Sequence, residues 1–185
     1  MNAGVQNLVI SLGAMQLARK ISFDDPEVLN YVRIGYVASQ LIVLAVYYYV
    51  SMAIKRKNDQ TVLKYVEPSG AMSQEPGELV TTTVRDYDLS ETSKLLRSAY
   101  MGIAMMAVMH IYFKFTQPLF VQALMGMKNL YDAKPIAIHV FGKPATGDLK
   151  RPFKAAGMFG AAPAGPQTDA AAIAEAEKRV GKKEE

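Results

Sequence analysis

The stretch that decides the fold is IGYVASQLIVLAVYYYVSMAI, which occupies residues 34–54 and carries no charge. These 21 residues are enough for a helix to cross a hydrocarbon core of about 30 Å. The run DDPE at 24–27 precedes it, and acids with a first-turn proline are typical of a helix start. Basic residues follow at 55–57, and three tyrosines at 47–49 lie near that end, as aromatic residues do at membrane interfaces. The stretch predicts a membrane-spanning helix.

Two further apolar blocks are shorter or interrupted. Residues 3–18 are uncharged, but a helix of this length reaches only about 24 Å. A third block contains Lys114 and, shortly after it, Pro118. Because proline inside a helix removes a hydrogen bond and kinks or ends the helix, we expect one helix over 98–116 and a second over 119–131.

The positions of the basic residues indicate the orientation of the chain. The loop over 55–97 holds seven Lys and Arg residues, and the tail over 128–185 holds ten. Because Lys and Arg near a membrane favour its cytoplasmic side, both regions are expected there, which requires an even number of crossings between them. A helical hairpin that turns at Gln117 and Pro118 satisfies this requirement. A single crossing, with the tail outside the cytoplasm, remains the alternative.

The polar parts predict a little β structure. Residues 61–66 and 79–86 are rich in Val, Thr and Tyr and favour a β-hairpin with a long loop, and 136–141 resembles a third strand. Asp88 and Glu91 have the spacing of a capping box at the start of the next helix. From residue 155 the composition is rich in Ala, Gly and Pro, which is typical of a mobile tail, and residues 169–180 predict a short helix within it.

The expected fold is therefore mainly α: a small multi-span membrane protein with three to four transmembrane or re-entrant helices, a small cytosolic β element and a flexible C-terminal tail. The predicted parts are a short N-terminal membrane helix plus the long transmembrane helix (1–57), a cytosolic loop with the β-hairpin (58–93), a membrane helix or helical hairpin (94–131), a basic cytosolic segment (132–154, the basic segment below) and the tail (155–185).

Composition excludes several kinds of chemistry. The chain has no Cys, which excludes disulfides, Cys-ligated zinc and thiol catalysis, and its two histidines leave little material for a histidine-rich metal centre. The sequence also lacks the nucleophile-elbow, zinc-protease, Walker A and Rossmann fingerprints. We therefore expect no enzyme activity, no catalytic residues, no metal and no cofactor.

Polar residues inside the apolar blocks are the candidate site, because charged groups are costly at a bilayer centre and are usually functional there. They form stripes at helical spacing and would line an intramembrane polar groove: Arg33, Tyr36 and Gln40 on one helix, His110, Lys114 and Gln117 on the next, and Gln122 on the second arm of the hairpin. The alternative is structural. Arg33 and Lys114 would then extend to the interface, and Gln40 and His110 would only pack between helices.

Three motifs resemble a known family. KYVEP at 64–68, TTVRDYDL at 82–89 and above all FGKPATGDLKRPFKA at 141–155 are similar to fungal SRP-independent targeting protein 3, formerly called inorganic phosphate transport protein 88. The resemblance implies an endoplasmic reticulum membrane protein that helps client membrane proteins reach and enter the lipid bilayer. The resemblance also implies that the protein acts beside the Sec61 translocon and the ribosome, together with other SRP-independent targeting components. The older name implies a component of phosphate transport, and a scaffold or assembly chaperone without insertase activity is a third hypothesis.

Two basic features suggest contacts and location. The basic patch, Lys143, Lys150, Arg151 and Lys154, would bind ribosomal RNA phosphates or anionic lipid headgroups, or would form an ordinary solvated loop. The family resemblance favours contact with the ribosome or translocon. Lys182 and Lys183 are the fourth and third residues from the end of the sequence, a dilysine spacing typical of retrieval to the endoplasmic reticulum from a cytosolic C-terminus.

Overall fold

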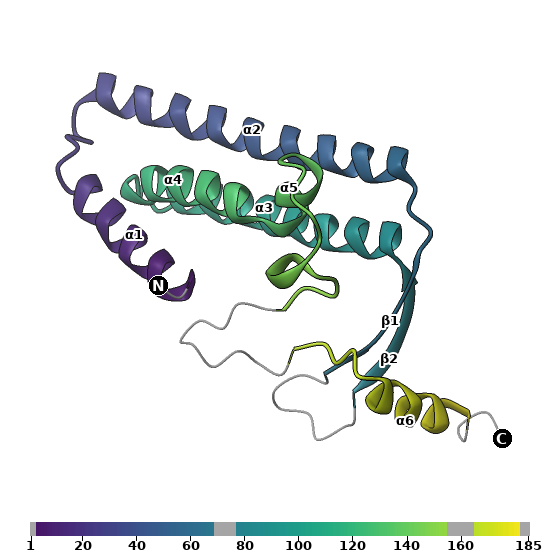
Figure 1. Cartoon of the computed structure of the whole chain (residues 1–185). Coiled ribbons are helices and arrows are strands. Elements are labelled where there is room, and N and C mark those ends of the chain that lie inside the picture. Colours follow the sequence, from purple (N-terminus) through teal and green to yellow (C-terminus); the bar gives the residue numbers. More distant parts are fainter. Residues whose placement is uncertain (1–2, 69–76, 155–164, 182–185) are drawn as a thin grey trace.

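Three long helices lie side by side in the computed structural model, which describes residues 3–68, 77–154 and 165–181 (Figure 1). They are α2 (Pro26–Lys57), α3 (Val84–Ile111) and α4 (Gln117–Asp132). A fourth helix, α1 (Ala3–Ala18), packs against α4. The chain is mainly helical and carries one small two-stranded sheet, as the sequence predicted.

Helix α2 begins and ends where the sequence indicated. The Asp25 carboxylate accepts a hydrogen bond from the Glu27 amide at 2.9 Å, and Pro26 occupies the first turn, where its missing N–H costs nothing. At the other end Asn58 adopts a left-handed conformation, and its amide donates to the Ile54 carbonyl. The 32 residues between these caps give a length of about 48 Å.

Within the described residues, α2 is the one helix both long and apolar enough to cross a bilayer. Only 33% of its most apolar window is buried inside the protein. Large side chains such as Ile34, Val37 and Leu41 are exposed on its outer face. An extended apolar surface of this kind is unusual on a soluble monomer and is compatible with a membrane location.

The three long helices alternate in direction. Tyr36 of α2 packs with Met106 of α3 and Leu119 of α4 near one end of the bundle. Towards the other end, Tyr47 and Val50 of α2 pack with Leu130 of α4. Helix α3 thus runs antiparallel to both neighbours, and α3 and α4 form a helical hairpin whose turn lies between Ile111 and Gln117.

The main core lies at the end of the bundle where α2 finishes and α3 starts. Val50 and Ile54 of α2 are almost fully buried there, together with Leu130 and with Ile136 from a short helix, α5 (Lys134–His139). After α5 the chain continues through the rest of the basic segment, which contains the single 3₁₀ turn η1 (Gly147–Leu149).

The predicted third strand at 136–141 is wrong, because this region is helix α5. Pro135 starts the helix, and Ile136, Ala137 and Ile138 are all buried. A short apolar run of this kind has no clear periodicity, so sequence alone does not separate a buried strand from a buried helical turn. Packing against α2 and α4 decided the outcome.

The β-hairpin is present, but α3 starts earlier than predicted. Strand β1 (Val62–Glu67) pairs antiparallel with β2 (Glu78–Thr83), and the predicted loop at 69–76 lies outside the described residues. Strand β2 passes directly into α3: extended Thr83 accepts a hydrogen bond from the Asp86 amide at 3.1 Å. Thr83 is therefore the N-cap, and the predicted capping box of Asp88 and Glu91 is wrong.

The end of the tail contacts the sheet instead of being free. Val66 and Gln167 exchange two backbone hydrogen bonds of 2.9 Å beside β1. Helix α6 (Ala170–Gly181) contacts both strands and buries Ala176. For residues 165–181 the predicted flexible tail is thus corrected; residues 155–164 lie outside the described residues.

Candidate functional site

Two of the predicted groove residues contact each other directly. Arg33 on α2 donates from its Nε to Nε2 of His110 on α3 at 3.0 Å. The opposite ring nitrogen of His110 lies 3.4 Å from the Phe115 carbonyl. A neutral imidazole that accepts from Arg33 carries its proton on Nδ1, where this carbonyl can accept it. The pair joins α2 to α3 close to the hairpin turn.

Tyr36 and Gln40 are buried in the interface between the helices. The Gln40 amide donates to the Ser39 hydroxyl at 3.3 Å, and that hydroxyl donates to the Tyr36 carbonyl at 2.7 Å. A Cβ added at Gly126 of α4 would lie 3.7 Å from Nε2 of Gln40, which is ordinary contact distance. The Tyr36 hydroxyl finds no hydrogen-bond partner among the described residues.

Gln122 of α4 faces α3 at a glycine. A Cβ added at Gly102 would lie 2.8 Å from Nε2 of Gln122, closer than real Cβ atoms approach. The missing side chain at Gly102 therefore leaves room for the Gln122 amide. Small residues allow helices to approach closely, and here one of them accommodates a polar group.

Lys114 and Gln117 do not join this interface. Both side chains are exposed near the hairpin turn, where Lys114 has a positive φ of 60°. The structure thus gathers five of the seven predicted residues between the helices, and we call these the polar interface: Arg33, Tyr36, Gln40, His110 and Gln122. It lies in the half of the bundle remote from Lys55, Arg56 and Lys57, whereas the main hydrophobic core lies in the half nearer those basic residues.

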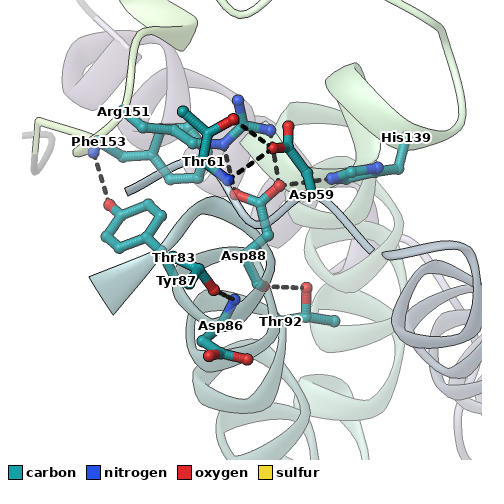
Figure 2. Close-up of polar contacts among 10 residues, drawn as sticks. All are labelled: Asp59, Thr61, Thr83, Asp86, Tyr87, Asp88, Thr92, His139, Arg151 and Phe153. Carbon is teal, nitrogen blue, oxygen red and sulfur yellow. Dashed lines mark hydrogen bonds and ion pairs between the residues drawn. The ribbon is translucent and has the colours of Figure 1, made fainter. Parts of the chain in front are cut away.

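A second polar cluster lies at the opposite end, around the first turns of α3 (Figure 2). Arg151 forms two hydrogen bonds of 2.6 Å with the Asp88 carboxylate, and Nε2 of His139 lies 2.7 Å from one of the same oxygens. An ionised carboxylate only accepts, so the imidazole is the donor. The side chains of Asp88, His139 and Arg151 are 1%, 6% and 12% exposed. These three residues form the Asp88 node.

The charge of Asp88 depends on its partners. Burial alone favours the neutral carboxyl, but the hydrogen bond from His139 and the pair with Arg151 outweigh it and hold the pKa of Asp88 below its ordinary value. Removing one partner from a buried pair leaves an uncompensated charge, which typically costs about 3–5 kcal/mol. The node therefore fixes the basic segment onto α3.

Aromatic rings extend this attachment. The Tyr87 hydroxyl accepts a hydrogen bond from the Phe153 amide at 2.6 Å, and the rings of Tyr65, Tyr87 and Phe153 meet edge to face at 5.9 and 5.4 Å. Burial raises the pKa of Tyr87, so its hydroxyl stays protonated. Lys134 of α5 donates to the Lys154 carbonyl at 2.6 Å. Residues 151–154 are thus held by α3 and α5, and Tyr87 of α3 contacts the sheet through Tyr65.

This arrangement divides the predicted basic patch. Arg151 bonds within the protein, so its predicted role as a free contact to ribosome, translocon or lipid is corrected. The side chains of Lys143, Lys150 and Lys154 are exposed. Lys182 and Lys183, the predicted retrieval signal, lie outside the described residues.

Sequence reasoning missed Asp88 and His139 as anchoring residues. The signal for Asp88 was present in the three motifs that carry the family resemblance, because the fold brings those motifs together, whereas His139 lies outside them. Tyr65 comes from the first motif, Asp88 from the second and Arg151 from the third. Within the described ranges, no three His, Asp or Glu side chains are arranged to hold a metal ion.

Comparison with known proteins agrees with this pattern. The family model described as "Phosphate transport (Pho88)" matches residues 1–184. SRP-independent targeting protein 3 of Saccharomyces cerevisiae is 49% identical over 179 residues, which cover 96% of this chain and 95% of the relative. A Schizosaccharomyces pombe homolog of that protein is 38% identical over 84% of this chain and 81% of its own length. No solved structure matches the chain. By extent and identity, this chain belongs to the Pho88 family.

Proposed function

We propose that this chain is an endoplasmic reticulum membrane protein that assists the targeting and insertion of client membrane proteins. The name of the Saccharomyces cerevisiae relative supports the targeting role. The observation that carries the insertion role is the polar interface: arginine, histidine and amide side chains lie between helices whose outer faces are apolar. In a membrane, such side chains are costly unless they serve a function.

The proposed topology is multi-pass, with α2 crossing the bilayer and the α3–α4 hairpin entering and returning. The end of α2, the start of α3 and the end of α4 lie at the same end of the bundle, where the basic residues gather. The proposal places that end in the cytosol, in agreement with the preference of Lys and Arg for the cytoplasmic side. The C-terminal tail is then cytosolic, as a dilysine retrieval signal requires.

Short helices would help a client to cross. The part of α3 after Arg97 and the whole of α4 reach about 21 and 24 Å, less than the hydrocarbon core of about 30 Å. Short spans locally thin a bilayer. In the proposed mechanism, polar flanks of a client pass the thinned region beside the polar interface, whose amide, imidazole and guanidinium groups replace part of the lost hydration.

The proposed partners are client membrane proteins, the Sec61 translocon, the ribosome and other SRP-independent targeting components. Exposed Lys150 and Lys154 are the proposed contacts to ribosomal RNA or to the translocon. Because the Asp88 node and Tyr87 hold the backbone beside them, these two lysines are presented in a fixed position. Preorganisation of this kind lowers the entropic cost of binding.

The test replaces polar groups with leucine. The combined change Arg33→Leu, Gln40→Leu, His110→Leu and Gln122→Leu should leave the protein folded, because interhelical polar contacts are worth only about 0.6 kcal/mol each. Insertion of a client into liposomes that contain the purified protein should fall several-fold. The matched control carries leucine at four exposed apolar positions: Ile34→Leu, Val37→Leu, Met101→Leu and Met105→Leu.

Normal insertion by the polar-to-leucine variant, at normal abundance, would leave a packing scaffold or assembly chaperone as the better account. The description of the family model favours a second candidate, a component of phosphate transport. Phosphate flux through the same liposomes tests that candidate directly. Flux without client insertion would replace the insertase proposal.

A further inference from the structure

An exposed aromatic pair lies beside the main core, outside both polar clusters. Tyr131, at the end of α4, and Phe141, just after α5, have ring centroids 5.5 Å apart. Tyr131 is 66% exposed and Phe141 is 47% exposed. Neither ring is needed to fill the core beneath, which Leu130 and Ile136 already occupy.

The turn after α5 holds this pair and a lysine rigidly. The amides of Val140 and Phe141 both donate to the Ile136 carbonyl, at 2.9 and 3.1 Å, and the Lys143 amide donates to the Ala137 carbonyl at 2.9 Å. Between them Gly142 has a φ of 64°, the left-handed conformation that closes such helix ends. Phe141 and Lys143 are therefore presented on a fixed backbone.

The pair lies at the same level of the bundle as other exposed aromatic residues. Tyr131 follows Leu130, which packs against Tyr47 and Val50 of α2. At that level of α2, the exposed hydroxyl of Tyr48 lies 2.6 Å from that of Tyr100 on α3. Two pairs of exposed aromatic rings, Tyr48 with Tyr100 and Tyr131 with Phe141, thus lie about two helical turns before the basic end of α2.

Cations lie just beyond these rings. Lys55, Arg56 and Lys57 are exposed at the end of α2, and Lys143 is exposed two residues after Phe141. Aromatic rings followed by basic residues are the arrangement that proteins use at the headgroup level of a membrane, with the cations drawn to anionic lipids. The two rings alone would suit many apolar partners, but the flanking positive charge selects an anionic surface.

We propose that Tyr131, Phe141 and Lys143 form an interfacial anchor that binds anionic phospholipid headgroups of the leaflet next to Lys55–Lys57. The inference rests on the proposed function in one respect, that α2 crosses the bilayer. The two rings enter the interfacial layer, and the Lys143 ammonium meets a lipid phosphate or carboxylate. The anchor fixes the depth of α5 and so holds the rest of the basic segment at the membrane surface.

The chain has no tryptophan, which allows a direct depth measurement. Single tryptophans are introduced by Phe141→Trp, by Leu41→Trp in the middle of α2 and by Val62→Trp on the β-hairpin; all three native side chains are exposed. The full-length proteins are placed in bilayers of phosphatidylcholine and phosphatidylserine whose lipids carry bromine either near the headgroup or deep in the acyl chain.

The proposal expects shallow bromines to quench Phe141→Trp most strongly, deep bromines to quench Leu41→Trp most strongly, and neither to quench Val62→Trp. Adding Lys143→Glu to Phe141→Trp should reduce its quenching in phosphatidylserine bilayers but not in pure phosphatidylcholine. Quenching of Phe141→Trp that is as weak as that of Val62→Trp would overturn the anchor. A loss of quenching on adding Lys143→Glu that is equal in bilayers with and without phosphatidylserine would also overturn it.

The two proposals fail separately in this experiment. An unquenched Leu41→Trp would contradict the spanning of α2, whatever Phe141→Trp does. A quenched Leu41→Trp beside an unquenched Phe141→Trp would keep the spanning helix and remove the anchor. A Phe141→Trp signal that responds to added ribosomes but to neither set of bromines would assign this surface to RNA and would also overturn the anchor.

Discussion

The Asp88 node and the polar interface both place polar side chains at contacts between packed elements, but the two sites differ in how many of those side chains have hydrogen-bond or ion-pair partners. In the node, both carboxylate oxygens of Asp88 are paired, and Arg151 meets them with two parallel hydrogen bonds. In the polar interface, Arg33 is partly exposed, and the buried hydroxyl of Tyr36 has no partner among the described residues.

This difference separates a structural role from a functional one. A buried charge with every partner in place resists change, because losing any partner leaves another charge uncompensated. Polar groups with spare hydrogen-bonding capacity, such as the exposed Arg33 and the hydroxyl of Tyr36, contribute little to stability and remain able to bind a visiting polar group. The comparison predicts that changes in the node affect stability, whereas changes in the polar interface affect activity.

The largest effect is expected from Asp88→Ala. It leaves Arg151 and His139 buried without their anion and should cost about 3–5 kcal/mol of stability. Proteolysis after residue 140 should accelerate in detergent-solubilised protein, because the basic segment loses its anchor. Asp86→Ala is the control: its exposed carboxylate makes only a long contact to Arg85, so its effect should stay below about 1 kcal/mol. Equal effects of the two changes would contradict the structural role of the node.

A smaller effect is expected from acid. Because the folded-state pKa of Asp88 is lower than its unfolded value, the node stabilises fully above the ordinary Asp pKa of about 3.9 and loses that contribution as pH falls through the folded value. Unfolding midpoints of the wild type should therefore fall below about pH 4 more steeply than those of Asp88→Asn. Parallel profiles would show that Asp88 does not ionise differently in the two states.

The smallest effect on stability is expected at Gly102 and Gly126, the two glycines that lie next to side chains of the polar interface. Gly102→Ala forces the Gln122 amide to move, since the new Cβ would lie 2.8 Å from it, whereas Gly126→Ala makes only ordinary contact with Gln40. Both should alter stability by about 1 kcal/mol or less, because alanine favours a helix and a side-chain amide is flexible. Client insertion should decrease with Gly102→Ala and stay normal with Gly126→Ala. Indistinguishable insertion would remove Gln122 from the functional set.

Several features were predictable because they depend on local chemistry. The uncharged run at 34–54, the DDPE start and the basic stop define α2 without reference to the rest of the chain. The Val- and Thr-rich segments predicted the β-hairpin, and Pro118 predicted a break between two helices, although the turn lies at 112–116 and Gln117 and Pro118 begin α4. The helical stripes placed Arg33 and His110 on facing sides of neighbouring helices, and these residues form a hydrogen bond.

Other features were decided only by the tertiary structure. Asp88 has the spacing of a helix cap, yet it becomes a buried anchor because α5 and residues 151–154 pack against α3. The run at 136–141 suits a strand until its neighbours bury it as a helix. Arg151 looks like one of four surface cations until Asp88 meets it. In each case at least one deciding partner lies more than 50 residues away in the sequence. Local pattern therefore determined where the helices run, and long-range packing determined which charges remain available at the surface.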